Sequence, residues 1–209
     1  MPIPVYYAMT MQEMRAAERY PEHLALIDFC SSAKDAIVIL TDRKPWDIRQ
    51  LQTIVDNQNK ILLDFQRPDD PENHRLIAEL ERLGLPYCAT GIYADKYDCA
   101  VLLPPVPPTR ALADHIAPWK GRALWLELAL DGQCITLTKD GATDRYISHA
   151  EQHRHCHCDA ELHCHYCIRT MQSSAEFTLW RTKEDIADLL KEAESLGVRL
   201  AVGLWQEWK

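Results

Sequence analysis

The sequence lacks the long hydrophobic run that crosses a membrane, since no stretch of about eighteen apolar residues occurs. It also lacks a secretory signal. The N-terminal segment MPIPVYYAMTMQEMRAAERY has no basic region followed by a long apolar core and a small-residue cleavage site. We therefore expect a cytosolic protein with no membrane partner.

Basic clusters interleaved with aromatic residues are missing as well. The formal net charge of -8 creates a field that repels phosphate backbones, so nucleic acid is excluded as an expected partner. None of the motifs Gly-x-Gly-x-x-Gly, the Walker loop, Gly-x-Ser-x-Gly or His-Glu-x-x-His is present. Dinucleotide-binding, NTP-binding, serine-hydrolase and zincin functions are therefore unsupported.

The composition is that of an ordinary globular protein, with 209 residues, 47% hydrophobic and 26% charged. We predict a single α/β domain over residues 1–209. Eight cysteines are present, but a cytosolic chain of this length builds its core without disulfides. Four of them stand in apolar contexts that predict reduced packing residues: Cys30, Cys88, Cys99 and Cys134.

Short apolar runs alternate with helical patterns in the first half of the chain. Strands are predicted at residues 36–41, 60–65 and 85–90, with helices between them. Asp70 can cap the second helix, Pro71 suits its first turn, and Gly84 can end it in the left-handed conformation. Strands that are apolar on both faces and separated by helices indicate a parallel sheet.

The pattern changes at Asp131-Gly132, where two alternating runs flank a hairpin signal. We predict an antiparallel insertion over residues 131–176, after which α/β structure resumes with a strand at 177–180, a helix begun by Thr182 and Asp185, and a final strand. The predicted architecture resembles an abbreviated or distorted (β/α) barrel, with an open doubly wound sheet as the alternative.

A cluster of histidine and cysteine is the one feature that indicates metal chemistry. The stretch HAEQHRHCHCDAELHCHYC alternates with period two, as a strand does, and Asp159 to Glu161 can form a three-residue turn. Such a hairpin pairs His157 with His163, His155 with His165, and Cys156 with Cys164. The candidate zinc ligands are His155, Cys156, His157, Cys158, His163, Cys164, His165 and Cys167.

A different turn length favours the thiols instead, as Cys156-x-Cys158 and Cys164-x-x-Cys167. Zinc is the expected ion either way, and so many ligands in one hairpin predict a structural rather than a catalytic metal. The alternatives are a solvated edge that binds metal adventitiously and close thiols that oxidise to disulfides.

Acidic residues at predicted strand ends support a second hypothesis. Asp64, Glu127 and Glu207 follow or end apolar runs, and Asp42 is a fourth candidate. Two such carboxylates beside Trp125, Trp205 or Trp208 would resemble a barrel that cleaves a glycosidic bond.

Three functions therefore remain open. The first is a zinc-binding protein, and the second is a barrel-type hydrolase, active or degenerate, acting on a carbohydrate or other small molecule through Asp64, Glu127 and Glu207. The third is a non-catalytic interaction protein.

Overall fold

The computed structural model describes residues 3–43, 46, 48–130, 132–147 and 156–208. These residues fall into two compact units. One comprises residues 3–104, 119–127 and 197–209 and is called the barrel unit here; the other comprises residues 1–2, 105–118 and 128–196 and is called the sheet unit. The prediction of one domain over the whole chain stays a prediction.

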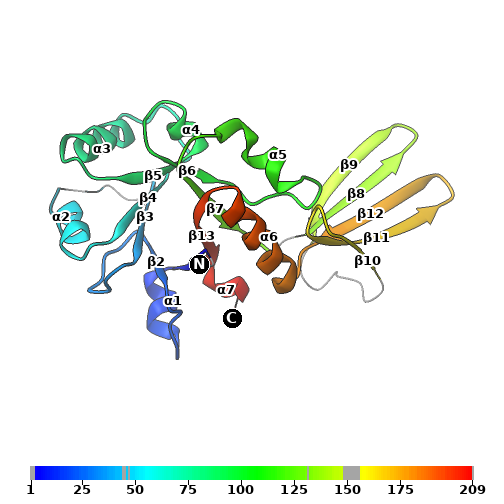
Figure 1. The fold of residues 1–209 in the computed structure, drawn as a ribbon, viewed down its shortest axis with the longest axis horizontal. Helices are drawn as coiled ribbons and strands as arrows, with labels where there is room; N and C mark the ends of the chain where they lie inside the picture. Colours follow the sequence, from blue (N-terminus) through cyan, green and yellow to red (C-terminus); the bar gives the residue numbers. More distant parts are fainter. Residues whose placement is uncertain (1–2, 44–45, 47, 131, 148–155, 209) are drawn as a thin grey trace. The chain divides into compact units, whose positions relative to one another are not determined.

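Eight parallel strands close into a barrel in the order β1-β13-β7-β6-β5-β4-β3-β2 (Figure 1). The strands are β1 Val5–Met9, β2 Leu24–Ile27, β3 Ile37–Thr41, β4 Lys60–Asp64, β5 Tyr87–Thr90, β6 Ala100–Leu103, β7 Leu124–Leu128 and β13 Val198–Leu204. The predicted (β/α) barrel is confirmed. The alternative of an open doubly wound sheet is wrong, because β13 lies between β7 and β1 and leaves no open edge.

Residues of each strand alternate between the inside of the barrel and the layer of helices outside it. Ile39 and Leu62 face inward, where they line a cavity. Val38 and Leu63 face outward and are completely buried in a core cluster with residues of α2 Ile48–Asp56 and α3 Pro71–Arg82. Burying a side chain of this size contributes about 1.5–3 kcal/mol, which explains why these strands are apolar on both faces.

Local signals at the ends of α3 act as predicted. The Asp70 side chain accepts a hydrogen bond of 3.0 Å from the Glu72 backbone amide, and Pro71 takes the first turn. Gly84 follows the helix with a φ of +65°, a conformation that side chains disfavour. The remaining helices of the barrel unit are α1 Met11–Ala16, α4 Gly91–Ala94 and α7 Trp205–Trp208.

The sheet unit contains five antiparallel strands in the order β10-β11-β12-β8-β9 (Figure 1). They are β8 Gly132–Thr138, β9 Gly141–Ile147, β10 His157–Asp159, β11 Cys164–Met171 and β12 Ser174–Trp180. The antiparallel insertion is thus confirmed, but it extends to Trp180. The segment 177–180, predicted as a strand of the resumed α/β part, instead pairs with β8 and β11.

Helix α6, Lys183–Ser195, follows directly and has the predicted capping box, in which the Thr182 hydroxyl accepts from the Asp185 backbone amide at 3.2 Å. The sheet unit also holds α5 Leu112–Ile116, and the short helix Ala117–Trp119 lies at its boundary. No helix in the described part of the chain combines the length and the apolar character needed to span a membrane.

Candidate active site

A cavity of about 80 Å³ lies inside the barrel, toward the carboxyl ends of the strands. Its walls come from seven of the eight barrel strands. Most are apolar: Ala8, Ile27, Ile39, Leu62, Leu102, Val202, Gly203 and Leu204. The two acidic lining residues are Asp64, the last residue of β4, and Glu127 of β7. Two carboxyl groups therefore share a small, mostly apolar space.

Glu127 is affected by the charges of the other two predicted carboxylates. The pKa of Glu127 is raised from 4.5 to about 7, first by burial and then by the negative charges of Asp64 and Glu207. Glu207 belongs to α7, which begins immediately after β13. The structure thus brings Asp64, Glu127 and Glu207 together from β4, β7 and α7. Their catalytic roles stay a prediction.

The loop after β4 is held by a network of polar contacts. The Asp42 carboxylate accepts hydrogen bonds from the backbone amide of Gln66 at 2.7 Å and from the Asn73 side chain at 2.6 Å. The Gln66 side-chain amide in turn donates to Asp64 at 2.6 Å. Asp42 therefore orients the loop rather than joining the carboxyl pair, and Gln66 is a neighbour of Asp64 that the sequence analysis did not identify.

Two of the three candidate tryptophans, Trp205 and Trp208, follow β13 directly and contact Tyr7 of β1. The ring centroid of Tyr7 is 5.5 Å from that of Trp205 and 5.9 Å from that of Trp208, in edge-to-face arrangements. Burial raises the pKa of the Tyr7 hydroxyl. A β-carbon at Gly203 would lie 2.8 Å from Trp208 Nε1, so the absence of a side chain there allows the ring to approach β13.

The histidine and cysteine hairpin has a register different from the predicted one. His157 lies opposite Tyr166, Cys158 opposite His165, and Asp159 opposite Cys164. The pairings predicted between His157 and His163 and between Cys156 and Cys164 are therefore wrong. The turn spans residues 160–163 instead of 159–161, and this odd shift moves the β11 residues to the opposite face relative to β10.

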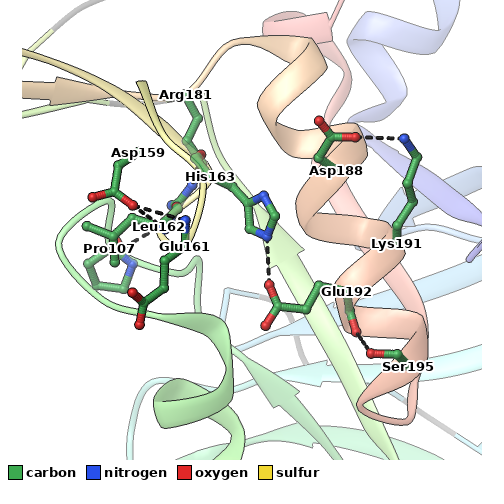
Figure 2. Close-up of polar contacts among 10 residues, drawn as sticks. All are labelled: Pro107, Asp159, Glu161, Leu162, His163, Arg181, Asp188, Lys191, Glu192 and Ser195. Carbon is green, nitrogen blue, oxygen red and sulfur yellow. Dashed lines mark hydrogen bonds and ion pairs between the residues drawn. The ribbon is translucent and has the colours of Figure 1, made fainter. Parts of the chain in front are cut away.

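Several of the candidate metal ligands have protein partners. His163 Nε2 lies 2.6 Å from a Glu192 carboxylate oxygen (Figure 2), and His165 Nδ1 lies 2.7 Å from that of Asp185. The buried Cys164 thiol donates to the Pro108 carbonyl. The His157 ring packs on Tyr166, with centroids 5.3 Å apart.

A zinc site needs several of these side chains to converge on one point. Within the described ranges, no group of three or more histidine, cysteine or acidic side chains is placed to hold one ion. His155 lies outside the described residues, together with the predicted pairing of His155 with His165. In the observed register, the described candidate ligands thus do not form a zinc cluster. Zinc binding stays a prediction.

Arg181 is a buried residue that the sequence analysis did not identify. Its guanidinium donates to four backbone carbonyls, those of Val106, Pro107, Leu162 and His163. Figure 2 draws Arg181 beside Pro107, Leu162 and His163. Burial lowers its pKa. The available signal was an arginine placed directly after the apolar strand end Leu179-Trp180, because a charged side chain there must find buried acceptors. Arg181 ties the hairpin turn to the segment around residues 106–107.

The comparisons with known proteins establish the fold. No family model and no curated protein matches the chain. Among solved structures, the spore cortex-lytic enzyme SleL of Bacillus cereus is similar with a TM-score of 0.55 and 9% identity, over 96% of this chain and 70% of that one. SleL of Bacillus megaterium QM B1551 is similar with a TM-score of 0.52 and 12% identity, over 97% of this chain and 70% of that one.

The C-terminal domain of a putative chitinase from Desulfitobacterium hafniense DCB-2 gives a TM-score of 0.50 and 10% identity, over 98% of this chain and 94% of that one. Identities this low relate the chains by architecture and not by shared site residues. The chain therefore resembles these structures in its overall fold over most of its length.

Proposed function

We propose that this protein acts on carbohydrate and hydrolyses a glycosidic bond at the carboxyl end of its barrel, with Glu127 as the general acid. The observation that carries the proposal is that Asp64 and Glu127 line one mostly apolar cavity. Burial there, and then two neighbouring carboxylates, raise the pKa of Glu127 to about 7. Glycoside hydrolysis needs one protonated and one ionised carboxyl group near the same bond. Environments that separate the pKa values of paired acids supply that combination.

In the proposed reaction, the Glu127 carboxyl gives its proton to the glycosidic oxygen as the bond to the anomeric carbon breaks. Asp64, which lines the same cavity, is the second carboxyl group and stabilises the positive charge that develops on the sugar ring. Water completes the reaction by adding to the anomeric carbon, and its proton restores Glu127 or leaves to solvent. Glu207 contributes by keeping the Glu127 proton bound near neutral pH.

Two features support a polysaccharide as the substrate. The similar solved structures are described as cortex-lytic enzymes and a putative chitinase, and they share the fold over most of this chain. The cavity of about 80 Å³ holds only about two or three water volumes, so a sugar ring must lie across its mouth with one substituent inserted. Trp205 and Trp208 belong to α7, which follows β13 directly. Their rings are the candidates for stacking on a sugar ring there.

Release of new reducing ends from chitin oligosaccharides and from purified spore cortex tests the proposal. The parent protein should release them, and Glu127→Gln should not, because glutamine keeps the shape of the side chain but has no proton to give. Glu72→Gln is the matched control, because Glu72 lies on α3 with its side chain 66% exposed. Equal activity of Glu127→Gln and the parent would refute the role of Glu127.

A carbohydrate-binding protein without hydrolysis is the second candidate. It is favoured by the Gln66 amide, which lies 2.6 Å from Asp64 Oδ1 and so engages one of the oxygens that hydrolysis would use. Saturable binding of the same oligosaccharides by calorimetry, without release of reducing ends, would support this function over the first.

A further inference from the structure

Two cysteines of the sheet unit face each other across neighbouring strands. The register of β10 and β11 pairs His157 with Tyr166, so its continuation by one residue places Cys156 opposite Cys167. Cys156 stands immediately before β10, and Cys167 is within β11. Because the two residues are cross-strand partners, their side chains project from the same face of the hairpin.

The two thiols contact each other through a side-chain hydrogen bond. Directly opposed residues of an antiparallel pair have α-carbons about 4.5–5.5 Å apart, which lies inside the range of about 4.4–6.8 Å that disulfides require. Both residues are partly exposed, so small reagents can reach them. A disulfide can therefore form here with little movement of the backbone.

Neighbouring cysteines are less favourable partners. Cys158 is exposed and lies on the same face of β10 as Cys156, but two residues along a strand separate α-carbons by about 6.6 Å, near the upper limit for a disulfide. Cys164 is buried, and its thiol donates to the Pro108 carbonyl. Its register partner is Asp159, so it projects from the opposite face.

We propose that Cys156 and Cys167 form a redox-active cross-strand dithiol that closes to a disulfide by exchange with a small disulfide such as oxidised glutathione. One thiol loses its proton and attacks a glutathione sulfur, which releases one reduced glutathione and leaves a mixed disulfide. The second thiolate then attacks the protein sulfur of that mixed disulfide and releases a second reduced glutathione. Two protein thiols are oxidised, and one glutathione disulfide is reduced.

The bond would fasten the shortest described strand of the sheet. Among the described strands, β10 has three residues and lies at the edge of the sheet, next to β11. Short edge strands open readily because one ladder of hydrogen bonds holds them. A disulfide that joins Cys156 to Cys167 closes the hairpin, so backbone amides in β10 should exchange with solvent more slowly in the oxidised protein.

The experiment uses the full chain in glutathione buffers from fully reduced to a large excess of the oxidised form. Free thiols are then blocked with N-ethylmaleimide, and the protein is digested without reduction. Residues 155–169 contain no internal lysine or arginine, so trypsin leaves all four cysteines in one peptide. Cleavage after Glu161 separates Cys156 and Cys158 from Cys164 and Cys167, and fragmentation of the bridged peptides identifies the bonded pair.

A bridge between Cys156 and Cys167 is expected in the parent and in Cys158→Ala, which is the matched control. Cys156→Ala and Cys167→Ala should each lose it, while their barrel cysteines remain blocked as in the parent. A bridge that uses Cys158 or Cys164 as the main product would overturn the proposal. So would the absence of any bridge in excess oxidised glutathione, or about one equivalent of zinc in the reduced protein that protects both thiols from N-ethylmaleimide.

Discussion

Replacing Glu127 by glutamine should remove a pH-dependent loss of stability. The Glu127 pKa rises from 4.5 to about 7 on folding. Below pH 4.5 the residue is protonated in both states and has no effect. Between these values the unfolded chain releases a proton that the folded protein retains, so stability falls as pH rises. At about 1.4 kcal/mol for each pKa unit, the full loss reaches about 3 kcal/mol above pH 7.

Urea unfolding of the parent and of Glu127→Gln at pH 5, 6, 7 and 8 measures this effect. The free energy of unfolding of the variant, relative to that of the parent, should rise by about 2–3 kcal/mol between pH 5 and pH 8, because glutamine stays neutral throughout. Histidines that titrate in the same range affect both proteins equally and cancel in the difference. Glu72→Gln should show no such trend, since its side chain is 66% exposed. A difference between Glu127→Gln and the parent that is constant from pH 5 to 8 would refute the reasoning.

Three further predictions concern Asp64, the buried Arg181, and Gly203 beside the ring of Trp208. Asp64→Asn removes the carboxylate charge that raises the Glu127 pKa more than Glu207 does, so the Glu127 pKa measured by carbon-13 NMR should fall; an unchanged value would show that the two groups do not interact. Arg181→Met leaves four carbonyls without their donor and should lower the free energy of unfolding by about 3 kcal/mol, whereas a loss below about 1 kcal/mol would contradict its role. Gly203→Ala places a β-carbon 2.8 Å from Trp208 Nε1 and should shift tryptophan fluorescence; an unaltered spectrum would mean that the ring does not pack there.

Much of the barrel could be predicted from the sequence because its signals are local. The apolar run before Thr41, the cap at Asp70 and the left-handed Gly84 each specify one strand or helix end. Closure could not be predicted in this way. β1 and β2 were missed, because Val5–Met9 and Leu24–Ile27 are short and follow no clear helix pattern, and an eightfold barrel needs both.

The site shows the same division. The positions of Asp64 and Glu127 at strand ends follow from the chain order of the strands, so their grouping could be anticipated. The register of the hairpin was harder to predict, because it depends on the length of the turn. The sequence of residues 159–163 is compatible with more than one turn length. The turn begins one residue later than predicted and is one residue longer, which exchanges the predicted pairing of Cys156 with Cys164 for one with Cys167.

The pH dependence of kcat/KM for oligosaccharide hydrolysis tests the central claim, that a protonated Glu127 cleaves a glycosidic bond at the barrel mouth. Activity should decline above pH 7 as Glu127 loses its proton, because the high-pH limb reports the pKa of the essential acid in the free enzyme. In Asp64→Asn or Glu207→Gln, any residual activity should decline at a lower pH. Activity that increases from pH 7 to pH 9, or that survives in Glu127→Gln with the same profile, would contradict the account.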